Sequence, residues 1–335
     1  MSLPGFEDEG LGGCEPELDE ESVYDDENGR ACPAESRLMH RFWTELLGDQ
    51  LAICPKKSGA NRVLDIGTSY GLWAIDYGAS QSRSRSHRRG HKPRFTASLV
   101  RFLSLIENIK LITSRLPPNC WFEVVDIEKD WSWLGTFDLI FVRNMGGAFM
   151  DWADFLRKAY DALKPGGWIE FQEHSFRFQN NGSALGGGKI QQWCELLHGS
   201  MFTHKRPMSV GPKMKEMMSA AGFSVTDDVL WRVAAREESS ENALGSACRR
   251  KKSTRQQSRY NPYERIQHTA STLRSGPDTT KYHDLTHRVV ERYLEILSLS
   301  SFTRYQGFSK EEVIAKCAEV RQLLKSEDND GAWPM

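Results

Sequence analysis

The residues of this chain best suited to chemistry are an aspartate within one short apolar segment and the mostly small residues that follow that segment. The segment Arg62–Ile66 is apolar apart from its first residue and Asp65, and Gly67–Gly71 follows it directly. Such a run predicts a buried strand of a parallel sheet, and Leu72 then begins a helical pattern. Because glycine lets backbone N–H groups approach a ligand closely, a strand, a glycine turn and a helix N-terminus can hold a nucleotide-like molecule.

The spacing Asp65-x-Gly67-x-Ser69-x-Gly71 is not the G-x-G-x-x-G pattern of dinucleotide sites. It resembles the D/E-x-G-x-G-x-G motif of S-adenosylmethionine-dependent methyltransferases. A pyrophosphate favours bare N–H groups at a helix N-terminus, whereas S-adenosylmethionine presents an ammonium and a carboxylate. We expect Asp65 to accept from the ammonium, directly or through water. The turn residues expected to serve the carboxylate are Gly67, Thr68, Ser69 and Gly71. An ordinary strand–helix turn is the alternative for so short a motif.

Further strand and helix patterns predict the sheet that would position this turn. In chain order they are a strand within 117–127, a strand over 137–144, a helix over 155–163 ended by Lys164–Gly167, and a strand over 168–173. Alternating strands and helices imply right-handed crossovers, a parallel sheet and a ligand cleft at the carboxyl ends of the strands. Asp126, Arg143 and Asn144 are therefore expected at the same edge as Asp65.

Several of these segments, taken in order, resemble the fungal LaeA-like methyltransferases. The likeness is carried by 62–71, 126–131, 138–147 with 151–152, and 163–170. Further similarity lies in 24–28, in the amphipathic segment 36–51 and in 297–309. That family includes a regulator of secondary metabolism and many enzymes of secondary-metabolite pathways. The resemblance implies an α/β fold, with a Rossmann-like methyltransferase sheet, helices on both faces and helical additions. It also implies S-adenosyl-L-methionine as the cofactor and a small-molecule acceptor.

The resemblance suggests roles for the strand-end residues. Asp126 is placed to accept from the adenine amino group, with the Ile127 N–H facing the ring; a strand-end cap is the alternative for Asp126. Trp131 and Trp133 either cover the adenine side or pack in the core. Arg143 and Asn144 lie where the methionine part and the acceptor meet. The alternative for Arg143 is a structural pairing, with Asp138 or Glu170.

No catalytic residue is assigned, because methyl transfer is an in-line displacement that depends mainly on alignment and on the exclusion of water. A general base is needed only when the acceptor is not already nucleophilic. The histidines that follow the last predicted strand, His174, His198 and His204, are candidates for that role. Histidines without a catalytic role are the alternative.

The region 79–98 departs most from the family pattern, because it is rich in Arg, Ser and His where the fold needs its second strand. That strand normally ends in an acid, about 20 residues after the glycine turn, that binds the ribose. No acid lies between Asp76 and Glu107. We expect a disordered basic insertion here, with Leu99–Leu116 replacing the strand and Glu107 as the available acid. A solvated loop, a nucleic-acid contact and a translated intron are the interpretations of the basic run.

Composition sets further limits on the organisation of the chain. The 335 residues carry a net charge of -1, and the mean hydropathy is -0.54. These values argue against direct nucleic-acid binding driven by bulk charge and hint at unpacked segments. The predicted divisions are a disordered acidic tail over 1–32, a methyltransferase core over 33–235, a basic polar insertion over 236–280 and a C-terminal helical segment over 281–335. The family's final strand has no counterpart in 326–335, so another segment substitutes or the sheet is one strand short.

Two functions follow from these patterns. The first is methylation of a small-molecule intermediate of secondary metabolism; the second is a nuclear regulatory protein on the same fold, with a protein partner and little catalysis. The 7 scattered cysteines predict reduced thiols, no metal site and a cytoplasmic or nuclear location. No membrane-spanning segment is predicted. Ser69 in place of the usual glycine either lowers cofactor affinity or donates to the carboxylate.

Overall fold

The computed structural model describes residues 33–83, 94–100, 117–131, 133, 136–174, 186–227, 232–234, 268–270, 283–325 and 332–334. The helices are α1 (Pro33–Leu46), η1 (Pro55–Lys57), α2 (Leu72–Arg83), α4 (Trp152–Ala162), α5 (Gly186–Thr203), α6 (Gly211–Ala220), α7 (His283–Gln306) and α8 (Lys310–Lys325). The strands are β1 (Arg62–Ile66), β2 (Arg94–Val100), β3 (Cys120–Val125), β4 (Phe137–Arg143), β5 (Leu163–Gln172), β6 (Ser224–Asp227), β7 (Arg232–Ala234), β8 (His268–Ala270) and β9 (Ala332–Pro334).

The core of the molecule is a 7-stranded sheet in the order β3-β2-β1-β4-β5-β8-β6, and its paired strands are parallel. The apolar runs of β1 and β4 account for their central place, because Leu64 and Ile140 are fully buried. The strand order reverses between β1 and β4, which is the position where open α/β sheets bind ligands. The predicted α/β Rossmann-like class is therefore confirmed.

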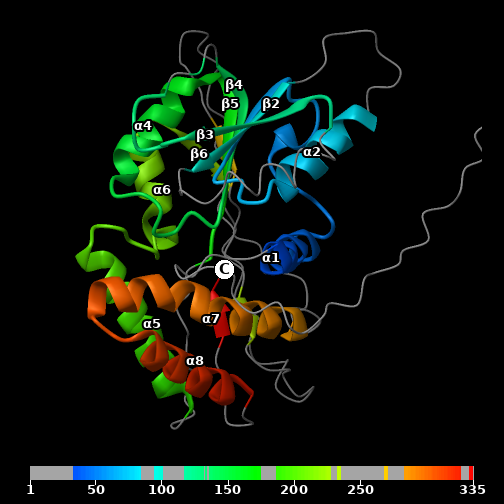
Figure 1. Cartoon of the computed structure of the whole chain (residues 1–335). Helices are drawn as coiled ribbons and strands as arrows, with labels where there is room; N and C mark the ends of the chain where they lie inside the picture. The colour runs from blue at the N-terminus through cyan, green and yellow to red at the C-terminus, as the bar shows by residue number, and fades with distance from the viewer. Residues whose placement is uncertain are drawn as a thin grey trace, which may run out of the picture.

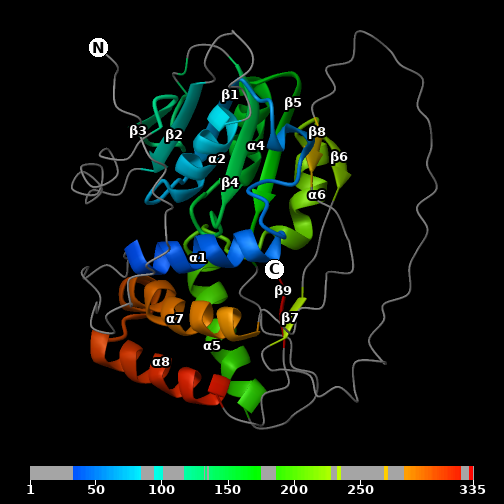
Figure 2. The ribbon, with the colours of Figure 1, turned by 90° about the vertical axis from the view of Figure 1, so that its right-hand side faces the viewer.

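Helices cover both faces of the sheet (Figures 1 and 2). On one face α2 packs through Trp73, whose ring stacks on that of Phe141 at 3.7 Å between centroids. On the other face α4 and α6 contribute to the largest apolar cluster, through residues that include Phe155 and Met218. Asp151 caps α4 by accepting from the backbone N–H of Asp154.

A second group of helices lies beyond the carboxyl edge of the sheet. Both views place α1 between the sheet and α7, and α5 and α8 pack against α7 (Figures 1 and 2). The apolar stripe of α1, which includes Phe42 and Leu46, packs against Leu285 and Val289 of α7. Trp193 of α5 donates to Ser298 of α7 at 2.9 Å. The helical additions therefore form a layer that faces the ligand-binding edge.

The second strand differs from the sequence prediction. Arg94–Val100 forms β2 between β1 and β3, rather than Leu99–Leu116, and α2 extends to Arg83. Regular structure therefore occupies both ends of the predicted insertion over 79–98. The physical reason is that the backbone of Arg94–Val100 pairs in parallel with β1 on one side and with β3 on the other, with Ala97 opposite Asp65. Residues 84–93 lie outside the described residues. So does 101–116, which contains Glu107.

The far edge of the sheet also differs from expectation. The strand β6 ends at Asp227, and β7 pairs separately with β9. The gap left by the family's final strand is filled by His268–Ala270, which forms β8 between β5 and β6. This strand lies inside the predicted insertion over 236–280. The tail over 1–32 and, apart from β8, the predicted insertion over 236–280 lie outside the described residues.

Candidate functional site

A pocket of about 220 Å³ lies at the carboxyl edge of the sheet, where β1 and β4 meet. Its walls come from the turn after β1, the end of β4, the start of α2, the helix α1 and one residue of α7. The lining residues are Ser36, Met39, His40, Asp65, Gly67, Thr68, Ser69, Tyr70, Leu72, Trp73, Phe141, Arg143, Asn144 and Tyr293. Most of the residues singled out from the sequence therefore meet in one cavity.

The turn after β1 has a backbone that favours glycine. Gly67 and Gly71 have φ values of 72° and 74°, and the Gly71 N–H donates to the Thr68 carbonyl at 2.8 Å. Gly71 closes the turn but does not line the pocket. Ser69 also has a positive φ, of 51°, and its hydroxyl lies 3.3 Å from that of Ser36 on α1. The serine that replaces the usual glycine thus links the turn to α1.

We expect Gly67→Ala to impair both folding and ligand binding. A Cβ at Gly67 would overlap Sδ of Met145, and the left-handed backbone is itself unfavourable for alanine. We predict a loss of about 1–3 kcal/mol in the free energy of unfolding, measured by urea denaturation. Gly59→Ala is the matched control, because Gly59 has a φ of 80° and open space around it. Equal losses in the two variants would attribute the whole effect to backbone strain and contradict the overlap with Met145.

Asp65 places an acid inside the pocket. Its side chain is 3% exposed, and burial raises its pKa to about 7, although the neighbouring Thr68 and the charge of Arg143 oppose this rise. An ionised carboxylate at this depth is costly unless a cation accompanies it. The site is therefore suited to a positively charged group of a ligand.

Arg143, at the end of β4, is held by a series of polar contacts. Its Nε donates to Oε1 of Gln172 at 2.8 Å, and its Nη1 lies 3.1 Å from Nδ1 of His40. Nη2 is buried and has no hydrogen-bond partner among the described residues. Burial lowers the pKa of the guanidinium to about 9, and the charges of Asp65 and Glu170 oppose this fall, so Arg143 stays protonated at neutral pH.

The structural pairings considered for Arg143 are only partly present. Asp138 instead accepts from Lys164 at 2.9 Å and from two backbone N–H groups, those of Asn61 and Arg62. Glu170 acts on Arg143 through its charge, and it accepts a direct hydrogen bond from Gln172 at 2.8 Å. Nη2 of Arg143 is therefore the guanidinium nitrogen that has no hydrogen bond among the described residues.

Asn144 adopts a left-handed backbone with a φ of 55°. Its side-chain oxygen accepts from the indole N–H of Trp43 on α1 at 3.0 Å. Its backbone N–H donates to the carbonyl of Gln172 at 3.0 Å. Asn144 thus joins the end of β4 to both α1 and β5.

Asp126 and Ile127 follow β3 at the same edge of the sheet, but they do not line the pocket. Asp126 accepts from the Glu128 N–H at 3.2 Å and lies 3.7 Å from Nζ of Lys129. Ile127 is 1% exposed and packs in the main apolar cluster. The contacts of Asp126 are those of a strand-end cap. The adenine role of both residues stays a prediction.

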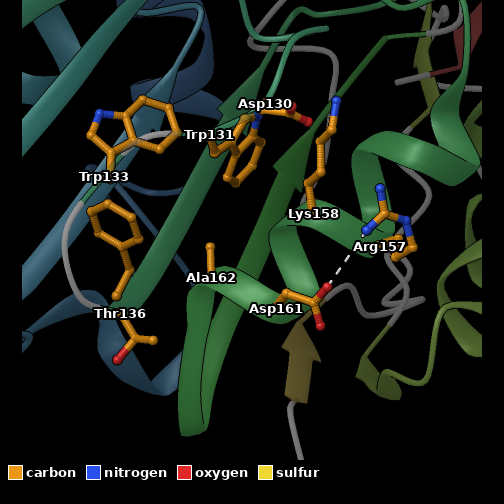
Figure 3. Close-up of a pocket in the computed structure, with 9 residues that line it drawn as sticks. Asp130, Trp131, Trp133, Thr136, Arg157, Lys158, Asp161 and Ala162 are labelled. Atoms are coloured by element: carbon orange, nitrogen blue, oxygen red, sulfur yellow. Dashed lines mark ion pairs between the residues drawn. The ribbon is translucent and has the colours of Figure 1, made fainter.

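The two tryptophans of the loop before β4 lie on the α4 side of the sheet (Figure 3). Trp131 and Trp133 meet edge to face, with 5.1 Å between ring centroids, and they pack against the main apolar cluster. They line a surface groove of about 410 Å³ together with Arg157 and Lys158, both of which pair with Asp154. Packing is therefore the role that the described contacts support for both indoles.

The histidines proposed as bases do not line the pocket. His174 is buried, and burial lowers its pKa to about 3, so that it stays neutral. His204 stacks on Tyr305 at 3.7 Å between ring centroids, and its Nδ1 lies 2.9 Å from the Ser200 carbonyl. No group of three or more potential metal ligands occurs among the described residues.

Sequence reasoning did not identify the pocket residues contributed by α1 and α7. Ser36 and His40 lie on α1, and Tyr293 lies on α7 more than 200 residues later. The amphipathic pattern of 36–51 was the available signal, because it predicts a helix with one apolar face. Nothing in the pattern distinguished the residues of that helix that face the pocket.

The strand order, the glycine turn and the buried acid define an α/β protein of the methyltransferase class. A family model described as a methyltransferase domain matches residues 36–227, which is more than half of the chain. The chain therefore belongs to the methyltransferase domain family, and the resemblance inferred from its motifs is confirmed.

Individual proteins are similar to parts of this chain. Methyltransferase pytC of Aspergillus terreus is 30% identical over 189 residues, which are 56% of this chain and 53% of pytC. The secondary metabolism regulator LAE1 of Cochliobolus heterostrophus is 28% identical over 204 residues, 58% of this chain and 61% of that protein. This chain thus covers little more than half of either relative. A methyltransferase structure from Aquifex aeolicus has a TM-score of 0.40 at 14% identity, and the match covers 60% of this chain and 93% of that one.

Within the part of the chain that the structure describes, no helix has the length and apolar character required to cross a membrane.

Proposed function

We propose that this protein is an S-adenosylmethionine-dependent methyltransferase that acts on a small-molecule intermediate of fungal secondary metabolism. The observation that carries the proposal is the buried Asp65 beside Arg143 in a pocket at the reversal of strand order. A buried carboxyl group and a buried guanidinium in one cavity suit a ligand that carries both an ammonium and a carboxylate. The similarity to methyltransferases pytC and cpsF supports the enzymatic class.

The pocket holds the amino-acid end of this ligand in the proposed complex. Asp65 accepts from the ammonium, and Arg143 together with backbone N–H groups of the turn residues that line the pocket, Gly67–Ser69, faces the carboxylate. Asp126 lies beyond this end, since β1 and β3 are two strand positions apart, about 10 Å. That span suits a ribose between the two, with the adenine near Asp126.

When bound, the cofactor supplies an electrophilic methyl group on sulfur. The protein's part is to align the acceptor with that group and to exclude water. Tyr293 from α7, with Met39 and His40 from α1, walls the pocket on the side opposite the sheet. We place the acceptor side of the site at these two helices.

Calorimetric titration of the purified full-length chain with S-adenosylmethionine and S-adenosylhomocysteine tests the proposal. We expect micromolar dissociation constants for both ligands and none measurable for adenosine monophosphate, which lacks the amino-acid end. Absence of binding by both sulfur nucleosides would contradict the proposed function. Methyl transfer to small molecules in a fungal extract, followed with a labelled methyl group, then identifies the acceptor class.

A regulatory role is the second candidate, and the similarity to secondary metabolism regulators favours it. In this case the same pocket binds the cofactor while a protein partner replaces the small-molecule acceptor. Binding without turnover on any small-molecule fraction, together with nuclear accumulation of the tagged protein, would support this role. The cysteines Cys54, Cys120, Cys194 and Cys317 are buried and are not in disulfides, which suits a cytoplasmic or a nuclear location equally.

A further inference from the structure

Arg143, at the end of β4, is linked through hydrogen bonds to side chains on the helices α1 and α2. His40 on α1 lies between Arg143 and Asp76 on α2: its Nδ1 is 3.1 Å from Nη1 of Arg143, and its Nε2 is 2.9 Å from Oδ2 of Asp76. A guanidinium has no acceptor, so Nδ1 of His40 must accept. The ring proton therefore resides on Nε2 and is donated to the Asp76 carboxylate.

A second contact holds the guanidinium through another of its nitrogens. Nε of Arg143 donates to Gln172, whose amide in turn donates to Glu170. The Arg143 guanidinium also lies over the ring of Phe141, at 5.1 Å from its centroid. With Nε and Nη1 both engaged, Nη2 is the nitrogen left without a described partner in the buried wall of the pocket.

We propose that His40 is a positioning residue that orients Arg143 so that its guanidinium binds the carboxylate of the cofactor. The inference rests on the proposed function, since it assigns a partner to one end of the same ligand. Asp76 fixes the tautomer of His40, His40 fixes Nη1, and the carboxylate occupies Nη2. Docking of α1 on the sheet edge and binding of the cofactor are thereby coupled.

The chemistry of the proposal is a charge-assisted hydrogen bond between a guanidinium and a carboxylate. The amino-acid end of the cofactor supplies one such carboxylate, and an acidic acceptor molecule would supply another. Decarboxylated S-adenosylmethionine distinguishes these sources, because it keeps the ammonium and the sulfonium and lacks only the carboxylate.

The test compares His40→Leu with the unchanged chain, using both nucleosides as ligands in calorimetry. We expect the unchanged chain to bind S-adenosylmethionine about tenfold more tightly than the decarboxylated form, which corresponds to about 1.4 kcal/mol. His40→Leu is expected to lose most of this preference, by weakening S-adenosylmethionine binding while leaving the decarboxylated ligand unaffected. Asp76→Asn changes the exposed partner of His40 and leaves His40 itself in place. We expect it to reduce the preference for S-adenosylmethionine as well.

Two further variants separate positioning from structure. His40→Gln keeps an acceptor and a donor on the side chain and is expected to restore the preference to within about threefold of the unchanged chain. Arg41→Leu is the matched control, because Arg41 pairs with Glu45 along α1 and does not line the pocket. We expect it to leave both affinities unchanged.

The proposal is overturned if His40→Leu weakens both nucleosides equally, which is the behaviour of a residue that only supports the fold. It is also overturned if the unchanged chain binds the two ligands equally well. In that case, a rise in the KM of His40→Leu for acidic acceptors alone would assign the Arg143 guanidinium to the carboxylate of the acceptor. Failure of the unchanged chain to bind either nucleoside is a different result, because it rejects the proposed function itself.

Discussion

Asp65→Asn is expected to weaken S-adenosylmethionine binding about 100-fold at pH 8, as measured by calorimetric titration. Loss of one member of a buried, hydrogen-bonded charge pair typically reduces affinity by about 2–5 kcal/mol. Asp65 is 3% exposed and lines the pocket, so water has little access to solvate the ligand ammonium in place of the carboxylate. Asparagine keeps the size of the side chain and removes only the charge that the ammonium requires.

The pH dependence of binding gives this prediction a second readout. Burial holds the pKa of Asp65 at about 7 in the ligand-free pocket, above its ordinary value of 3.8. The ammonium requires the ionised form, so binding releases a proton from Asp65 below pH 7. Affinity should therefore rise with pH from about 5.5 to 7, by up to about tenfold per unit, and then level off. In Asp65→Asn this rise should disappear, apart from any contribution of Glu173, whose pKa burial also raises to about 7.

The stability of the ligand-free protein should change in the opposite sense. Because the folded chain binds the Asp65 proton more tightly than the unfolded chain, ionisation of Asp65 destabilises the fold as pH rises from 3.8 to about 7. At pH 8 Asp65→Asn should therefore be at least as stable as the unchanged chain. Asp161→Asn, on the exposed side of α4, is the control for both readouts. Equal affinity of Asp65→Asn and the unchanged chain would remove Asp65 from the binding site.

Glu170→Leu is expected to lower the free energy of unfolding by about 3–5 kcal/mol, measured by urea denaturation. Glu170 is fully buried in β5 and accepts from the backbone N–H groups of Ile53 at 3.1 Å and Cys54 at 3.0 Å. It also accepts from the Gln172 amide. Leucine fills a similar volume but leaves these donors buried without an acceptor.

Glu170→Gln is the matched comparison, because its amide oxygen can still accept from the segment before β1. We expect a loss of about 1–2 kcal/mol in this variant. Equal losses in the two variants would show that the charge matters and that the hydrogen bonds do not. Because Gln172 contacts both Glu170 and Arg143, we expect the leucine variant to bind S-adenosylmethionine more weakly as well.

The elements that could be predicted from the sequence are those whose local pattern agrees with their tertiary setting. The runs of β1 and β4 are apolar because both faces of these central strands are buried, so their positions followed directly from composition. The prediction of β2 was wrong in position, because Arg94–Val100 is strand by pairing rather than by pattern. The same holds for His268–Ala270, a polar segment that becomes β8 only because β5 and β6 offer partners on both sides.

The candidate site divides in the same way. Asp65 and Arg143 could be placed at the pocket because they end strands whose order the βα alternation fixes. His40 and Tyr293 could not, because they depend on how distant helices dock on the sheet edge. Asp126 was predicted on the same grounds as Asp65, yet it lies two strands away from β1 and outside the pocket.

The contact between α1 and α7 has a consequence for how the protein is made. The Tyr293 hydroxyl lies 3.5 Å from the carbonyl of Glu35, and the two residues are 258 positions apart. When the glycine turn and β4 of a nascent chain have been synthesised, one wall of the pocket is still missing. That wall is added only after α7 has left the ribosome. Cofactor capture is therefore expected to follow translation, and truncated messages should yield products that cannot be rescued by added ligand.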